Sequence, residues 1–185
     1  THPPFYPVLL FFWLQLVGSS AFATRALSAL IGTLAVPLMF VLAKRLTVRL
    51  DAHGRLTRPR VPWFAAVLAA ISPLMIYYSQ ETRMYELVAI LALASMGCLT
   101  PRPIVILSGA ERSRRIRRGG SESGVRYFLI TLLALYTHYS AFFVLAAENI
   151  FALVHWRKDR AALGRWTGLQ VMLVVAYIPW VVAQT

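Results

Sequence analysis

Long apolar runs separated by strongly basic segments are the feature that most constrains the fold of this chain. The apolar runs cover residues 5–17, 23–43, 61–79, 84–100, 126–156 and 166–184. Hydrophobic residues make up 58% of the 185 positions, whereas soluble domains average roughly 45–50%. So much apolar surface does not fit a water-soluble core, and we therefore predict an all-α polytopic membrane protein.

The basic residues set the expected orientation of this protein in the membrane. Seventeen of the 19 Lys and Arg lie in three connecting segments, about 44–60, 101–126 and 157–165. The positive-inside rule places these segments in the cytoplasm, so the turns near 18–25 and 79–84 lie on the extracytoplasmic side. The net charge of +12 is then a topology signal, and we do not expect nucleic acid as a partner.

We predict one membrane domain over residues 1–185. Residues 4–18 are expected to form an interfacial helix, because 13 apolar residues rise only about 20 Å against roughly 30 Å of hydrocarbon. Pro73 should kink the span in which it lies. Full spans are predicted at about 23–43, 61–79, 84–100 and 166–184.

Two alternatives exist for residues 126–156, where both ends of an apolar run are basic. Two short hairpin arms, 126–137 and 140–156, would meet at the polar break and return both ends to the cytoplasm. A single long tilted helix is the other possibility, and it would place residues 157–165 outside.

The polar stretch between two predicted spans carries the first candidates for a binding site. Arg83 leads them because its planar guanidinium matches the oxygens of a phosphate. The alternative for Arg83 is an anchor at the membrane surface or an ion pair with Glu81 or Glu86. Glu81 is either a site residue or a structural partner. Gln80 and Tyr85 can hydrogen-bond a sugar or a phosphate, but interfacial tyrosines also serve as anchors.

Two histidines complete the candidates. His138 lies in the polar break of an apolar run, where it is either a site residue or a histidine satisfied between helices. His2 precedes two prolines and is expected beside a phosphate or metal, or is an ordinary loop histidine. With Glu81 they could hold a divalent metal, but no spacing fixes that geometry and no metal ligand is assigned. Glu148, inside an apolar arm, is expected to bond Asn149 or a neighbouring helix.

Three segments that follow one another along the chain resemble the motifs of one family. They are His2-Pro3-Pro4-Phe5-Tyr6 with the later run Phe22 to Gly32, Ser72-Pro73 with Tyr78-Ser79-Gln80-Glu81-Thr82-Arg83-Met84-Tyr85, and Tyr136-Thr137-His138-Tyr139. Together they resemble the glycosyltransferase family 39 type membrane enzymes, the bacterial relatives of protein O-mannosyltransferases and of lipid A aminoarabinose transferases. The departure is Thr82, where alanine is usual in the family.

This resemblance implies a partial GT-C-like helix bundle in a multi-pass protein of the cell membrane. It implies transfer of a sugar from a polyprenyl-phosphate donor to a lipid, glycan or protein acceptor on the extracytoplasmic side. The family's key acidic residue lies upstream of the His-Pro-Pro segment, so we expect this sequence to be an inactive fragment without its catalytic base. The candidates above are then binding residues for the donor's sugar and lipid phosphate, with membrane lipids around the bundle and no cofactor assigned beyond a possible divalent metal.

Two other classes remain open. A transporter or lipid flippase would favour broken helices, inverted repeats and charges inside the membrane, and no internal repeat is visible here. A membrane scaffold without catalytic activity is the third reading.

Overall fold

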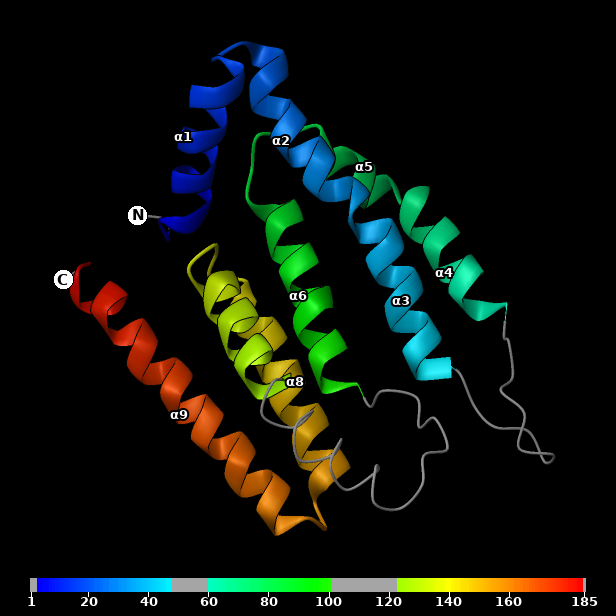
Figure 1. Ribbon diagram of the computed structural model, residues 1–185, viewed down its shortest axis with the longest axis vertical. Coiled ribbons are helices and arrows are strands. Elements are labelled where there is room, and N and C mark those ends of the chain that lie inside the picture. The colour runs from blue at the N-terminus through cyan, green and yellow to red at the C-terminus, as the bar shows by residue number, and fades with distance from the viewer. Residues whose placement is uncertain (1–2, 48–59, 101–122, 185) are drawn as a thin grey trace.

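The computed structural model describes residues 3–47, 60–100 and 123–184, and these ranges are helical throughout with no strand among them (Figure 1). His2 and most of the two longer basic segments lie outside the described residues. The helices are α1 Phe5–Val17, α2 Ala21–Thr33, α3 Ala35–Thr47, α4 Val61–Ala70, α5 Pro73–Ser79, α6 Tyr85–Leu99, an unlabelled helix Ser123–Leu135, α8 Ala141–Trp156 and α9 Arg160–Val182.

Two helices in the described ranges are long and apolar enough to cross a membrane. One is the 27-residue run Ala21–Thr47, made of α2 and α3, and the other is the 23-residue α9. A third crossing exists if α4 and α5 count as one broken span, since they pass the same test together with a bend of 47°. The structure therefore supports a helical membrane protein.

Local sequence explains where several of these helices begin and break. Gly18 ends α1 with φ +87°, a conformation that glycine adopts without strain. The Ser20 hydroxyl then caps α2 by accepting from Ala23 N at 3.1 Å. Pro73 opens α5 and has no N–H to continue α4, while its ring restricts Ser72 to extended backbone. The bend between α4 and α5 follows from that proline.

The run 126–156 is two helices that lie antiparallel. The Tyr127 hydroxyl donates to Glu148 Oε2 at 3.0 Å, and these residues stand equally far from the break at residues 136–140. The start of the first arm and the end of the second therefore lie at the same end of the bundle (Figure 1).

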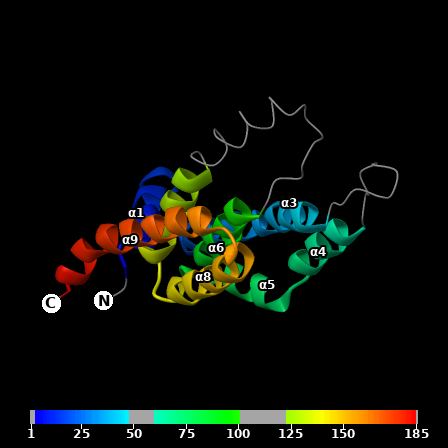
Figure 2. The ribbon, with the colours of Figure 1, turned by 90° about the horizontal axis from the view of Figure 1, so that it is seen from below.

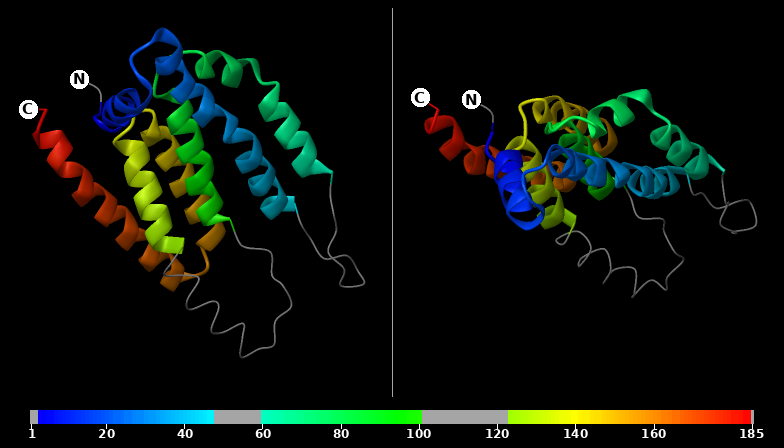
Figure 3. Two further views of the ribbon diagram at one scale, coloured as in Figure 1. Left: turned by 45° about the horizontal axis from the view of Figure 1, so that its top comes forward. Right: turned by 90° about the horizontal axis from the view of Figure 1, so that it is seen from above.

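Helix α6 is the centre of the described fold. It lies between the α2–α3 run and the pair formed by Ser123–Leu135 and α8 (Figure 3), and it contributes Leu87, Val88 and Leu99 to three separate apolar clusters. Seen from below, α3 and α4 lie toward one side and α9 toward the other (Figure 2). Large apolar side chains such as Phe22 and Phe143 remain at least 80% exposed, as expected where lipid covers the surface.

The bundle has two distinct ends. The turns after α1, after α5 and before α8 gather toward one end, whereas α3, α6 and α8 finish toward the other (Figure 1). At that second end, Arg45 of α3 donates to the Gly97 carbonyl in the last turn of α6 at 2.6 Å. A cation there complements the helix dipole as well as filling an orphan acceptor.

Candidate functional site

The polar turn Gln80–Met84 joins α5 to α6 at the end of the bundle opposite the basic segments (Figure 1). Its backbone is held locally, with Glu81 N donating to Tyr78 O at 3.2 Å and Arg83 N donating to Glu81 O at 2.9 Å. These bonds bring Glu81 and Arg83 to one side of a tight turn. The turn therefore presents both charged side chains together, beside the start of α6.

Arg83 and Glu81 form an ion pair, with Arg83 Nε 3.2 Å from Glu81 Oε2. The Arg83 side chain is 60% exposed and that of Glu81 27%. A pair this exposed contributes only about 0–1 kcal/mol to stability. The guanidinium is thus oriented by a carboxylate yet still open to an anion from outside, and it pairs with Glu81 and not with Glu86.

A row of aromatic rings connects this turn to the break before α8. The Tyr78 and Tyr85 ring centroids lie 4.9 Å apart, and those of Tyr85 and His138 lie 5.3 Å apart in an edge-to-face arrangement. Both spacings are typical of favourable aromatic pairs. Tyr85 is therefore the link between the second and third of the segments that resemble the family motifs.

The side chain of His138 is held by its own turn. His138 Nδ1 accepts from the Ser140 backbone N–H at 3.0 Å and lies 2.8 Å from Ser140 Oγ. Because Nδ1 is an acceptor, a neutral ring carries its proton on Nε2. The ring is thus fixed in orientation and tautomer, as a histidine in a binding site needs to be.

The beginning of α1 joins the same region. Phe5 N donates to the Tyr136 carbonyl at 2.9 Å, and the Tyr136 hydroxyl donates to the Ala176 carbonyl of α9 at 3.0 Å. The first bond connects the segment that follows His2 to the segment that contains His138. All three motif-like segments consequently meet around residues 136–138.

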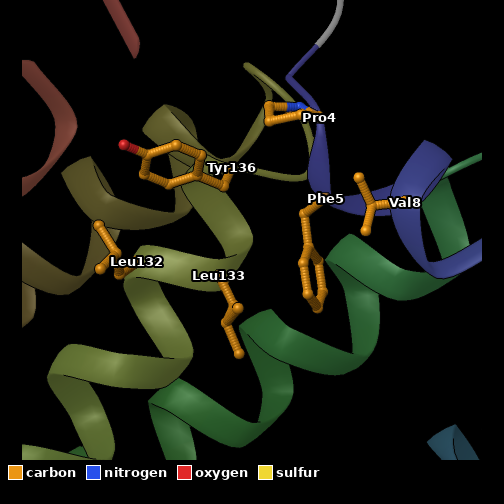
Figure 4. A pocket seen from close by; sticks show the side chains of 6 residues that line it. All are labelled: Pro4, Phe5, Val8, Leu132, Leu133 and Tyr136. Atoms are coloured by element: carbon orange, nitrogen blue, oxygen red, sulfur yellow. The ribbon is translucent and has the colours of Figure 1, made fainter. Parts of the chain in front are cut away.

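An apolar groove of about 310 Å³ opens beside this meeting point (Figure 4). Its lining residues are Pro4, Phe5, Val8, Leu132, Leu133 and Tyr136. The Tyr136 hydroxyl points away from Phe5 and Val8 in this view, in keeping with its bond to α9. The groove offers only apolar surface and suits a hydrocarbon group.

The sequence candidates are distributed as follows. Glu81 and Arg83 form one ion pair, Tyr85 and His138 form one ring contact, and Gln80 is exposed between α5 and that pair. His2 lies outside the described residues, so the metal site that required it is not part of this geometry. Among residues 3–47, 60–100 and 123–184, no three His, Cys, Asp or Glu side chains gather as metal ligands do.

Glu86 is a buried residue that the sequence suggested only as a partner for Arg83. It lies in the first turn of α6, is 1% exposed, and neither carboxylate oxygen has a hydrogen-bond partner. Gly32 of α2 and Ser79 of α5 pack around it. The signal available in the sequence was an acid directly after the polar turn and at the head of an apolar run.

Glu148 bonds neighbouring helices and not Asn149. Ser95 Oγ lies 2.5 Å from Glu148 Oε1, and Tyr127 contacts the other oxygen. Asn149 instead accepts from Trp166 Nε1 at 2.9 Å and donates to the Leu145 carbonyl. Of the two expected partners, the neighbouring helices are the ones used.

Comparison with known protein families, with curated proteins and with solved structures finds no match to this chain.

Proposed function

We propose that this chain is part of an integral membrane glycosyltransferase of the cell membrane. It would transfer a sugar from a polyprenyl-phosphate carrier to a lipid, glycan or protein acceptor on the extracytoplasmic side. The observation that carries this proposal is the convergence of the three motif-like segments, through the Tyr85–His138 ring contact and the Phe5–Tyr136 hydrogen bond. These segments are far apart in sequence, and a shared site is a direct reason for them to meet.

The residues of this meeting point match the parts of such a donor. Departure of a lipid phosphate builds negative charge on its oxygens, and the exposed guanidinium of Arg83 is a suitable donor for them. Glu81 holds that guanidinium in place until an anion competes for it. Tyr85, Gln80 and His138 supply hydrogen-bonding groups for a sugar, and the apolar groove beside Tyr136 suits part of an isoprenoid chain.

The base that takes the acceptor's proton is not assigned to any residue of this chain. An inverting transfer needs a carboxylate within hydrogen-bond reach of the acceptor hydroxyl. Glu86 and Glu148 are fully buried, and Glu81 is already paired with Arg83. The proposal therefore keeps the expectation that the acidic residue precedes Thr1.

The proposal is tested by reconstituting the protein, with the sequence that precedes Thr1, in liposomes and supplying polyprenyl-phosphate sugars. Transfer of labelled sugar to an acceptor fraction is the expected result. Arg165→Ala serves as a matched control for arginine substitutions, because this exposed arginine of α9 lies toward the opposite end of the bundle. A folded protein that transfers no sugar from any donor in the panel would refute the proposal.

A transporter or flippase is the second candidate, and two observations favour it. The α4–α5 pair is bent by 47°, and two carboxylates lie buried within apolar helices. Broken helices and intramembrane acids are frequent in transporters. Single cysteines at Gln80 and Arg83 distinguish the two: a transporter exposes them to membrane-impermeant reagents from each side in turn, and a transferase from one side only.

A further inference from the structure

Glu148 is the most deeply buried acid of the described residues that the proposed function does not use. It lies in the middle of α8 with 0% of its surface exposed. The residues that bond it come from two other helices, Ser95 from α6 and Tyr127 from Ser123–Leu135. In the described ranges, no Lys, Arg or His forms an ion pair with this carboxyl.

The hydrogen bonds around Glu148 form one continuous chain. Gln170 Nε2 of α9 donates to the Tyr127 hydroxyl at 3.3 Å, and that hydroxyl donates to Glu148 Oε2 at 3.0 Å. On the other side, Glu148 Oε1 lies 2.5 Å from Ser95 Oγ, which lies 2.9 Å from the Ala92 carbonyl. The chain crosses four helices and ends at a backbone acceptor.

Counting protons along this chain decides the state of the carboxyl. Ser95 has one hydroxyl hydrogen, and the Ala92 carbonyl can only accept. If Ser95 donates to Ala92, the short contact between Ser95 and Glu148 needs a hydrogen on Glu148 Oε1. A protonated carboxyl supplies that hydrogen, and its other oxygen still accepts from Tyr127. Every donor and acceptor in the chain then has a partner.

Charge leads to the same assignment. An ionised carboxylate in an apolar interior is strongly disfavoured unless a cation or several donors compensate it. Two hydroxyls are the partners that the structure gives Glu148, and one of them already has an acceptor. We therefore propose that Glu148 is held as a neutral carboxylic acid that donates to Ser95 and so joins α8 to α6.

Infrared spectroscopy of the protein in detergent micelles at neutral pH tests this directly. The difference spectrum between the wild type and Glu148→Gln should show loss of the carbonyl stretch of a protonated carboxylic acid. Glu86→Gln, which alters the other buried carboxyl, should leave that band in place. Glutamine can replace the proposed arrangement group for group, donating to Ser95 and accepting from Tyr127, so its Tm should stay within about 2 °C of the wild type.

Ser95→Ala provides a second test that does not depend on the folding of Glu148→Gln. A neutral Glu148 that loses its acceptor keeps its proton, so the band should remain and move to higher frequency. Absence of any protonated-carboxyl band assignable to Glu148 in both the wild type and Ser95→Ala would overturn the proposal. So would a band that disappears in Glu86→Gln and persists in a folded Glu148→Gln.

Discussion

Alanine at Gly32 is predicted to weaken the packing of α2 against α5 and α6. A Cβ at this position would stand 3.1 Å from the Cβ of Ser79 and 3.2 Å from Glu86 Oε2. Contacts this short require a neighbour to move. Ser79 is tied to the Ile76 carbonyl by a 2.8 Å hydrogen bond, and Glu86 is buried with little room to turn. The extra carbon should therefore push α2 away from the two helices.

Two opposing contributions set the size of the effect. Replacing glycine by alanine inside a helix stabilises it by about 1 kcal/mol, and overpacking an interface destabilises by about 1–3 kcal/mol. Gly168 of α9 is the matched control, because a Cβ there meets nothing within 4 Å. The gain in helix propensity is common to both variants. Gly32→Ala should thus be less stable than Gly168→Ala by about 1–3 kcal/mol.

Thermal unfolding in detergent, followed by circular dichroism, measures this difference. For a chain of this size it corresponds to a Tm lower by at least about 2 °C in Gly32→Ala than in Gly168→Ala. Glu86→Ala removes one of the two close contacts, so the penalty of Gly32→Ala should shrink in that background. If Gly32→Ala is as stable as Gly168→Ala, the close approach of α2 to Glu86 and Ser79 is wrong.

Three further predictions concern the candidate site and the helix that leads to it. Arg83→Ala should reduce sugar transfer by about 10²-fold or more in the liposome assay, with expression intact and Arg165→Ala near wild type; equal turnover in the two variants would remove Arg83 from the site. Tyr85→Phe keeps the ring that contacts His138 and should retain transfer, whereas Tyr85→Leu should lose most of it, and an active Leu variant would contradict a positioning role for the ring. Ser20→Ala removes the cap of α2 and should destabilise by about 1 kcal/mol, read as a lower Tm; an unchanged Tm would contradict the role of the cap.

Local signals in the sequence were sufficient to place most helix breaks. Gly18 and Pro73 each act on their own backbone, through a positive φ in one case and a missing N–H in the other. Such effects depend on one or two residues and require no knowledge of the fold. The helical membrane class was predictable for the same reason, since it follows from composition and from the length of the apolar runs.

Partners far apart in the sequence were not predictable in the same way. Arg83 had two carboxylates within reach, and only the folded turn shows that it pairs with Glu81 while Glu86 is buried. Glu148 bonds Ser95, 53 residues away, and nothing in either local sequence indicates that pairing. Pairings of this kind depend on how helices are arranged in space, which one sequence does not specify.

The register of three helices links the candidate site to the buried Glu148. Ten residues of α6 separate Tyr85 from Ser95, eleven separate His138 from Tyr127 along one arm, and ten separate His138 from Glu148 along the other. At 1.5 Å per residue each path rises about 15 Å. The ring contact at the top and the hydrogen bonds below can therefore form together only if both arms run alongside α6 in this register. A single long helix over residues 126–156 would satisfy neither set of contacts, so the fold-back is a precondition for both.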